Sequence, residues 1–515
     1  MATSDRSTYP PPLTPEQEQF LISTIKDWSI QHGLAVRPPA TFVPQDALER
    51  GVLATNAPVT LFPSLFPKAL FEEARAIQTS YNRLYAEIAR DEEWLGKIME
   101  ELIDVDDFIA NLWKIHLRVK EEGYVQKLSL GLFRSDYLIH APSNTSNPSL
   151  KQVEFNTISS SFGGLSSRVA RLHSELLTSP PGNPISYPSH PLLDGRLPPE
   201  NKAVEMLAAG MATAHAAYGP SKSSPQLPLG ILFVVQSGER NIFDQLALST
   251  RLTEYHKIPV FRLTTTEILD RTSIPDSNPS RPLIYTPPYS SSTPFEITTV
   301  YLRSFYTPDD YKSERDWTAR LQLERSAAIK SPTVLSQLSG CKKVQQVLAD
   351  PKRPDHLSRF YSDSDNEIIE RIRRTFAPQY DLSDPLGREL ALNPDTAVHH
   401  VLKPQREGGG NNIYKTEIPP FLQSLPERDW RGYVLMELIK PPTDAKNIVL
   451  RSDGSVASGE VVSELGIYGA ILWSSDGEVL HNEEGGWLLR TKGTETNEGG
   501  VAAGFSSLDS VLLYE

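Results

Sequence analysis

The most informative stretch of the sequence is Lys403-Pro404-Gln405-Arg406-Glu407-Gly408-Gly409-Gly410-Asn411-Asn412, which directly follows a predicted strand, Val398 to Leu402. Three consecutive glycines allow backbone N–H groups to approach an anion closely, and Lys403 adds a positive charge. The stretch is not a Walker A loop, because Gly-Lys-Ser/Thr is absent, and its consecutive glycines do not fit a dinucleotide fingerprint. It therefore predicts a loop that covers a phosphate, with a flexible surface turn as the alternative.

A second pattern is Val153-Glu154-Phe155-Asn156-Thr157. Alternate residues of a strand share a face, so we expect Glu154 and Asn156 on one face and Val153 and Phe155 on the other. Mg²⁺ in nucleotide sites takes a few protein oxygens, and phosphates and water complete the octahedron. The pattern predicts a magnesium site with Glu407 as the third ligand, and an ordinary exposed strand face is the alternative.

Basic residues form a third pattern. Arg490 and Lys492 share one face of a predicted strand, where Arg suits a substrate carboxylate and Lys suits a phosphate. Alternating basic residues on an edge strand are the other interpretation. Arg134 and Arg303 are expected at the ends of apolar strands, where ligand-facing groups collect, although each equally fits a structural ion pair.

The rest of the chain predicts a mixed α/β fold. Thr14, Pro15 and Gln17 predict a capping box that opens a helix ending at Gly33. Proline-rich stretches predict loops that carry neither helix nor central strand. The remaining expected elements are a helix through Leu70–Ile88, a parallel βαβ unit from Ile231 to Leu263, loops at about Ser179–Glu200 and Pro275–Pro294, and late strands at Tyr433–Leu438, Val461–Leu465 and Leu488–Thr491.

Composition excludes several classes of protein. Of 515 residues, 51 are Lys or Arg and 64 are Asp or Glu, which gives a net charge of −13. Such a chain lacks the basic surface that binding of nucleic acid requires. Its single cysteine, Cys341, allows no internal disulfide, and no zinc-ligand spacing occurs. With no apolar leader and no membrane-spanning run, we expect a cytoplasmic protein that contacts no membrane.

Six strings, in the same order from about Leu61 to the C-terminus, resemble eukaryotic glutathione synthetases. They are Phe133 to Tyr137, Val153 to Leu165, Glu239 to Gln245, Lys403 to Asn412, Ser463 to Gly469 and Leu488 to Lys492. The resemblance implies an ATP-grasp α/β fold with an inserted parallel-sheet subdomain and glycine-rich lid loops. It also implies a homodimer, two Mg²⁺ per subunit, ATP as co-substrate, and ligation of γ-glutamylcysteine to glycine.

The resemblance further implies three parts and a set of site residues. Residues 1–225 and 341–515 would form the ATP-grasp body, the latter with the lid, and 226–340 the inserted substrate-binding subdomain. Glu154, Asn156 and Glu407 would hold magnesium, while Arg134, Arg490, Lys403 and Lys492 would be catalytic. Around ATP it places Glu154, Lys342, Lys403, Glu407, Gly408, Gly409, Gly410, Asn411, Asn412, Tyr414, Met436, Glu437, Leu438, Ile439, Glu464, Lys492 and Glu498. Around the dipeptide it places Arg134, Ile158, Ser159, Ser160, Ser161, Glu239, Arg240, Asn241, Gln245, Arg303, Ser304, Phe305, Tyr306, Arg490, Val501 and Ala502.

Two departures from the family, and two competing functions, stay open at this point. Phe305 stands where the family usually has a small residue, and the insert at Pro275–Pro294 is longer than usual. A noncatalytic ATP-binding regulator is one alternative, and a synthetase that uses β-alanine or serine as acceptor is another. Cys341 is expected to be a packing residue, with a thiolate favoured by the lysines beside it.

Overall fold

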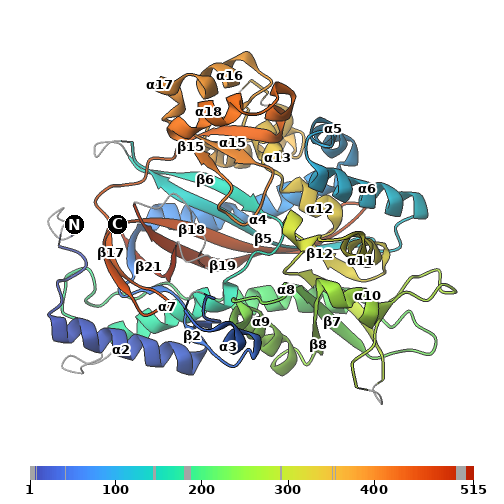
Figure 1. The fold of residues 1–515 in the computed structure, drawn as a ribbon, viewed down its shortest axis with the longest axis horizontal. Coiled ribbons are helices and arrows are strands. Elements are labelled where there is room, and N and C mark those ends of the chain that lie inside the picture. The colour runs from blue at the N-terminus through green and yellow to red at the C-terminus, as the bar shows by residue number, and fades with distance from the viewer. Residues whose placement is uncertain are drawn as a thin grey trace.

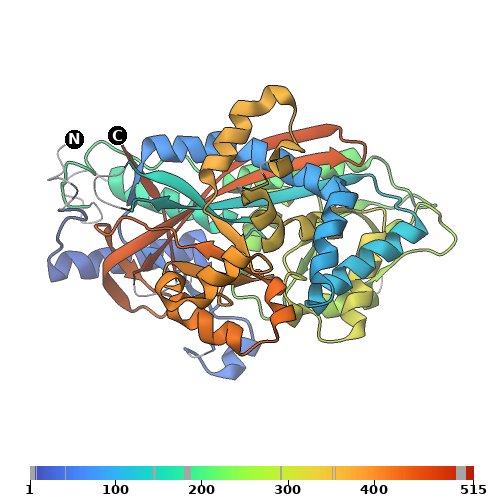
Figure 2. The same ribbon diagram turned by 90° about the horizontal axis from the view of Figure 1, so that it is seen from above.

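The computed structural model describes residues 6, 8–40, 42–142, 147–178, 187–289, 293–350, 352–353, 355–494, 501 and 506–515. They form three main sheets with helices packed around them (Figure 1). A second view, from above, shows long strands from both halves of the chain side by side in the middle (Figure 2). Among the described residues, no helix combines the length and apolar character needed to cross a bilayer.

The central sheet has seven strands in the order β17-β3-β20-β19-β18-β5-β6. Its long members pair antiparallel, and residues from the first and last thirds of the chain are therefore neighbours. The bounds are β3 Val59–Thr60, β5 Leu128–His140, β6 Ser149–Asn156, β17 Lys446–Leu450, β18 Val456–Ser474, β19 Val479–Gly493 and β20 Ser507–Asp509.

Apolar side chains alternate along β18 and fill a core on each face of this sheet. Ile467 and Ile471 join the cluster that contains residues of α4 (Lys68–Arg90), whereas Tyr468 and Ala470 join the cluster that contains residues of α8 (Ala203–Tyr218). The predicted helix through Leu70–Ile88 is α4 and is confirmed. Burial of both faces explains why β18 is apolar and buried without interruption from Leu465 to Trp473.

One irregularity in β6 changes which side chains face the site. The register with β5 pairs Asp136 with Glu154 but Tyr137 with Gln152, so Val153 is the extra residue of a β-bulge. Strict alternation fails at this point, and Val153 and Glu154 both line the same cavity. The expectation that Val153 faces the opposite layer is wrong, whereas Phe155 is buried as expected and stacks on Tyr85.

The second sheet has the order β8-β7-β11-β10-β9, with β12 also paired to β11. The predicted βαβ unit is confirmed as β7 Leu229–Val235, α9 Ile242–Glu254 and β8 Val260–Thr264, with the two strands parallel. Inside the proline-rich stretch, however, Leu283–Tyr285 forms β10 between two other strands. The expectation of loop alone was wrong there, because Pro282 and Pro287 flank three buried apolar residues without interrupting them.

The third sheet lies at the top of Figure 1 and has the order β13-β16-β14-β15. The strand predicted at Val398 begins instead at His400, because α17 (Pro394–Ala397) extends almost to it. β14 (His400–Pro404) and β15 (Ile413–Tyr414) pair antiparallel, so the glycine-rich stretch is the loop of a hairpin. β13 spans Gln379–Asp381, and β16 spans Tyr433–Glu437 close to the predicted bounds.

The remaining elements surround these sheets. The capping box at Thr14 and Gln17 is confirmed, and α2 ends at Gly33 with φ 67°. The other helices are α2 Pro15–His32, α3 Gln45–Glu49, α5 Glu92–Leu102, α6 Asp107–Glu122, α7 Gly163–Thr178, α10 Ile268–Arg271, α11 Glu314–Arg325, α12 Val334–Ser339, α13 Lys342–Ala349, α14 Asp355–Ser358, α15 Asn366–Thr375, α16 Pro385–Leu392 and α18 Ile418–Gln423. The other strands are β1 Ala35–Val36, β2 Thr55–Asn56, β4 Ser64–Pro67, β9 Thr272–Ser273, β11 Phe295–Leu302, β12 Ile329–Ser331 and β21 Val511–Tyr514.

Candidate functional site

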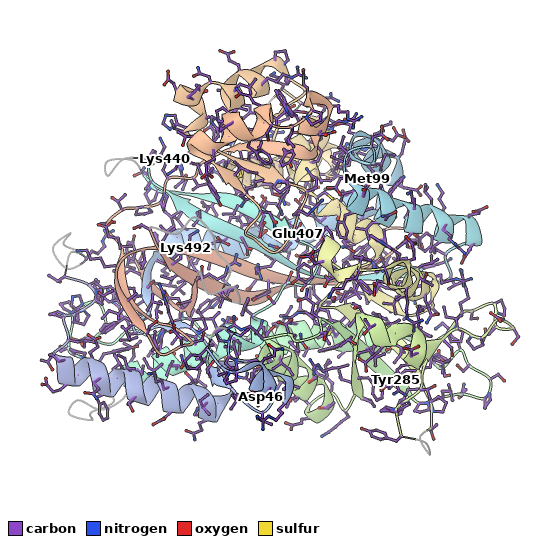
Figure 3. All side chains as sticks on the ribbon, in the orientation of Figure 1. Asp46, Met99, Tyr285, Glu407, Lys440 and Lys492 are labelled. Carbon is purple, nitrogen blue, oxygen red and sulfur yellow. The ribbon has the colours of Figure 1, made fainter. Side chains whose placement is uncertain are left out.

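A cavity of about 850 Å³ lies where the central sheet, the third sheet and the glycine-rich loop meet. Glu407 stands near the middle of the molecule, between those two sheets (Figure 3). The cavity gathers most of the residues predicted for ATP, metal and the reacting groups. They are Arg134, Glu154, Asn156, Ile158, Ser159, Ser161, Tyr306, Lys342, Lys403, Glu407, Gly408, Gly409, Asn411, Asn412, Tyr414, Met436, Glu437, Leu438, Ile439, Glu464, Arg490, Lys492 and Val501.

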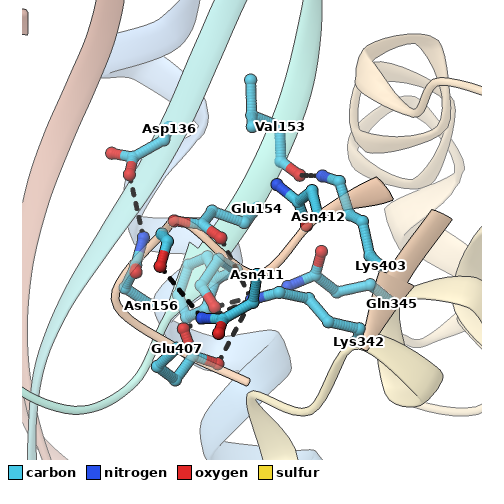
Figure 4. Close-up of polar contacts among 12 residues, drawn as sticks. Asp136, Val153, Glu154, Asn156, Lys342, Gln345, Lys403, Glu407, Asn411 and Asn412 are labelled. Carbon is cyan, nitrogen blue, oxygen red and sulfur yellow. Dashed lines mark hydrogen bonds and ion pairs between the residues drawn. The ribbon is translucent and has the colours of Figure 1, made fainter. Parts of the chain in front are cut away.

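Two carboxylates share one ammonium at the centre of the cavity (Figure 4). Lys342 Nζ lies 3.0 Å from Glu154 Oε2 and 3.2 Å from Glu407 Oε1. Nearby, Lys403 Nζ donates to the carbonyl of Val153 at 2.9 Å. The bulge in β6 is what turns this carbonyl and the Glu154 carboxylate toward residues of the third sheet and α13.

Burial and charge act in opposite directions on these groups. Burial raises the pKa of Glu407, and the neighbouring Glu154 adds to the increase. Burial also acts on Glu154, but the ammonium groups of Lys342 and Lys403 outweigh it and lower the pKa of that carboxyl. Burial lowers the pKa of Lys403 to about 8. Burial and the neighbouring Glu154 therefore oppose ionisation of Glu407, and Lys342 and Lys403 do not fully offset them.

The same cluster suits a hard cation. Asn156 Nδ2 donates to the Arg134 carbonyl at 3.3 Å and to Asp136 Oδ2 at 3.0 Å, which fixes the amide and leaves Oδ1 for another partner. An amide oxygen and two carboxylates are donors that Mg²⁺ prefers. Within the described residues, no three Asp, Glu, His or Cys side chains group as metal ligands, so any such site depends on the Asn156 oxygen.

Asp136 is a buried residue that contacts the site and that sequence reasoning missed. Its carboxylate binds Arg134 through Nε–Oδ1 at 2.6 Å and Nη2–Oδ2 at 2.8 Å, and it accepts from Arg490 Nη2 at 3.0 Å. Arg490 also pairs with Glu464. The signal was present, because Arg134 and Asp136 are two residues apart on one strand and so share a face.

The structure contradicts the predicted position of Arg134 in its strand and confirms that of Arg490. Arg134 lies in the middle of β5, not at a strand end, because β5 continues to His140. Arg490 and Lys492 share a face of β19 as expected, and both line the cavity. β19 lies between β18 and β20, so the edge-strand interpretation does not apply.

The glycine-rich loop lines one part of the cavity. Gly408, Gly409 and Gly410 have φ of 95°, 71° and 77°, a region that L side chains rarely adopt. A Cβ on Gly408 would lie 3.4 Å from the ring of Tyr306. Asn411 Nδ2 donates to the Gly409 carbonyl at 2.9 Å, which closes the loop on itself. Three positive φ values in succession explain why glycines occupy these positions.

A second set of predicted dipeptide residues lies behind the cavity wall. Arg303, at the end of β11 as predicted, forms a buried ion pair with Asp244 at 2.8 Å. Asp244 also accepts from the backbone N–H groups of Phe162 and Gly164 at 2.9 and 2.7 Å, and Phe162 lines the cavity. Predicted residues that the structure does not bring into the cavity lining are Ser160, Glu239, Arg240, Asn241, Gln245, Arg303, Ser304, Phe305 and Gly410. Glu498 and Ala502 lie outside the described residues.

Phe305 has an unusual backbone. Its φ is +69°, and its side chain is fully buried and packs against Tyr311 with ring centroids 4.9 Å apart. A left-handed conformation is costly for an aromatic residue, so the backbone of Phe305 is strained.

Cys341 corrects another expectation. Its side chain is buried, and burial raises the pKa of the thiol well above its usual value. Glu407 and Asp106 add to the increase, whereas Lys342 only partly opposes it. The thiolate that the neighbouring lysines were expected to favour is therefore disfavoured, although the expected packing role fits.

The fold and the cavity have the features of a phosphate-binding α/β enzyme. A family model described as the ATP-binding domain of eukaryotic glutathione synthase matches residues 15–513, and the chain belongs to this family. It is 37% identical to the glutathione synthetase large chain of Schizosaccharomyces pombe, over 98% of this chain and 99% of the relative. It is 38% identical to the human glutathione synthetase, over 89% and 90% of the two chains.

A solved structure agrees with the fold. A glutathione synthetase-like effector from Globodera pallida superposes with a TM-score of 0.72 over 98% of both chains, at 21% sequence identity. At that identity the comparison supports the fold alone.

Proposed function

We propose that the protein is an ATP-dependent ligase that joins γ-glutamylcysteine to glycine and forms glutathione, ADP and phosphate. The observation that carries the proposal is the cavity in which Arg134, Arg490, Lys342, Lys403 and Lys492 line one space together with the glycine-rich loop. Family membership supports the same activity.

The chemistry requires activation of a carboxylate. A carboxylate does not react with an amine at neutral pH, so the γ-phosphoryl group of ATP is first transferred to the cysteinyl carboxylate. This gives an acyl phosphate and ADP. The amine of glycine then attacks the acyl carbon, and phosphate leaves. No protein nucleophile takes part, and the protein contributes positioning and charge stabilisation.

Each group of cavity residues has a role in this scheme. Arg134 and Arg490 face the dipeptide and the reacting carboxylate, whereas Lys403 and Lys492 neutralise transferred phosphate charge. Met436 to Ile439, at the end of β16 and just beyond it, line the cavity and would border the nucleotide base. The glycine-rich loop closes over the site and keeps water from the acyl phosphate.

Glu154, Glu407 and the Asn156 oxygen would hold magnesium, with two ions per subunit as in the expected family pattern. When bound, the ion lowers the energetic cost of negative charge on the transferred phosphoryl group. We further propose the ATP-grasp architecture with lid loops, the division into 1–225, 226–340 and 341–515, a homodimer, and a cytoplasmic location.

Two alternative functions remain testable. A noncatalytic regulator would bind ATP without turnover, but it has no need of the full set of cations and carboxylates in the cavity. A synthetase for β-alanine or serine would differ at the acceptor pocket, for which Val501 and Ala502 are the proposed residues.

The test is a single incubation series. The protein is incubated with ATP, Mg²⁺, γ-glutamylcysteine and glycine, β-alanine or serine in turn, and both ADP and the ligated tripeptide are measured. Glycine-dependent ADP and glutathione in equal amounts support the proposal. ATP binding without formation of a product would favour the noncatalytic regulator. A preference for β-alanine or serine would identify that amine as the acceptor in place of glycine.

A further inference from the structure

The segment Arg303–Tyr306 carries a strained residue beside the site. Phe305 is held at φ +69°, a left-handed conformation that is costly for a residue with a large side chain. The next residue, Tyr306, lines the cavity, and its ring lies close to Gly408 of the glycine-rich loop. The orientation of the peptide group that joins Phe305 to Tyr306 therefore determines where the Tyr306 ring lies.

A buried glutamine holds this peptide plane. Gln337 Nε2, from α12, donates to the Phe305 carbonyl at 2.8 Å. The Tyr311 hydroxyl reaches the same carbonyl at 3.4 Å and is the weaker contact. Strained backbone persists where surrounding groups over-determine it, and the Gln337 bond is the strongest such constraint among the described contacts of this carbonyl.

The orientation of the Gln337 amide is fixed in turn by Arg320. Its Oε1 lies 3.5 Å from Nη2 of Arg320, and Arg320 forms a fully buried ion pair with Glu324 at 2.8 Å. A cation on one side and a carbonyl on the other allow only one amide orientation. The glutamine is thus anchored to the core on the side away from the cavity.

Gln337 also contacts the segment that follows β6. The Thr157 hydroxyl donates to the backbone carbonyl of Gln337 at 3.3 Å. Thr157 directly follows Asn156, a proposed metal ligand, and precedes the cavity residues Ile158 and Ser159. Gln337 therefore joins the segment after β6 to the segment after β11.

We propose that Gln337 is a positioning residue: its amide maintains the left-handed conformation of Phe305, and so presents Tyr306 to the dipeptide and to the glycine-rich loop. The inference rests on the proposed function for its kinetic consequence. Its structural consequence, the placement of residues 303–307, does not depend on what the substrate is.

The kinetic test uses Gln337→Met and Gln337→Asn, the second of which keeps an amide too short to reach Phe305. We expect the KM for γ-glutamylcysteine to rise about tenfold, as for one lost buried hydrogen bond, with the kcat and the KM for ATP changed less than about threefold. Gln322→Met is the matched control, because Gln322 Nε2 also donates to a backbone carbonyl, that of Thr272 at 3.1 Å, away from the cavity.

The substitution Phe305→Gly distinguishes a positioning role of Gln337 from a general loss of structure. Glycine adopts positive φ at little cost, so in a Phe305→Gly background the Gln337 substitutions should raise the dipeptide KM less than about threefold. An equal increase in both backgrounds, or a fall in kcat with unchanged KM, would overturn the proposal.

Hydrogen exchange provides the readout that is independent of turnover. The Tyr306 N–H donates to Asp310 Oδ2 at 3.1 Å, so its protection reports on the segment. We expect faster exchange across residues 303–307 in Gln337→Asn and Gln337→Met, and unchanged exchange there in Gln322→Met. Unaltered exchange in the Gln337 variants would refute the positioning role. If wild-type protein formed no tripeptide while the exchange result held, the proposed function would fail and the positioning role would stand.

Discussion

Asp136 binds the guanidinium of Arg134 at two points, through contacts of 2.6 and 2.8 Å. Both side chains are buried, so this pair is screened little by solvent. The remaining donor of Arg134, Nη1, points to the Ser161 carbonyl at 3.1 Å. The orientation of Arg134 is therefore set by the protein before a substrate binds, and Asp136 is the group that sets it.

Asp136→Asn should impair use of the dipeptide more than binding of ATP. The substitution removes the charge that orients both Arg134 and Arg490, and we expect kcat/KM for γ-glutamylcysteine to fall by roughly two orders of magnitude. Steady-state kinetics with each substrate varied in turn measure the effect. Asp453→Asn, in the exposed turn before β18, is the control, and normal dipeptide kinetics in Asp136→Asn would remove Asp136 from the site.

Arg490→Ala and Arg134→Ala should each weaken dipeptide binding and leave ATP affinity nearly unchanged. A lost two-point contact leaves the substrate carboxylate partly unpaired, at a cost of about 1–3 kcal/mol. Calorimetric titration with γ-glutamylcysteine and with a nonhydrolysable ATP analogue distinguishes the two ligands. If the two variants lost affinity for ATP and kept their affinity for the dipeptide, the arginines would bind ATP and the lysines would bind the dipeptide.

Glu154→Gln and Glu407→Gln should reduce turnover by roughly two orders of magnitude or more while the fold survives, because each removes an anionic oxygen from a hard-cation site. The Mg²⁺ concentration needed for half-maximal activity should rise as well. Glu460→Gln, on an exposed part of β18, is the matched control. Near-normal turnover of either variant at saturating Mg²⁺ would contradict the metal assignment.

Gly409→Val should raise the ATP requirement and slow turnover, because valine is strained at φ +71° and restricts the loop. Residues 407 to 413 should also gain hydrogen-exchange protection when an ATP analogue binds, since phosphate contacts offset the entropy of ordering glycines. Gly454→Val, at φ +84° in the turn before β18, controls for backbone strain alone. Equal protection with and without the analogue would mean that the loop is not a lid.

His173 should make stability depend on pH. Its ring is buried between the Ser510 hydroxyl at 2.7 Å and the Thr60 carbonyl at 3.0 Å, and burial lowers its pKa to about 4. The unfolded chain binds this proton at about pH 6.5, so the folded state loses stability as the pH falls from there toward 4, by roughly 3 kcal/mol in total.

The measurement is denaturant unfolding between pH 4 and 7 for the wild type, His173→Gln and the control His32→Gln. The free energy of unfolding of His173→Gln should vary less with pH than that of the wild type, and His32→Gln should follow the wild type. Parallel pH profiles for the wild type and His173→Gln would show that His173 is not responsible.

Local patterns determined much of what the sequence could predict. The capping box at Thr14, the βαβ unit, and the glycine-rich loop each depend on neighbouring residues, so their signal survives in a single sequence. Arg490 and Lys492 share a face because strand alternation is a local rule. The resemblance to a family then supplied the larger set of site residues that no periodicity reveals.

Only the tertiary structure decided the features that need contacts between distant segments. The bulge at Val153 turns two successive residues into the cavity, and the carboxylate of Asp136 joins Arg134 to Arg490 from another strand. The lysines beside Cys341 were expected to favour its thiolate, but burial raises the pKa of the thiol instead. The cost of removing the thiolate from water exceeds the attraction of Lys342, whose charge Glu154 and Glu407 already neutralise. Gln337 and Phe305 are 32 residues apart in the sequence, so their hydrogen bond forms only when α12 packs beside Phe305. Long-range packing, burial and strain are properties of the assembled fold and leave no periodic trace in the sequence.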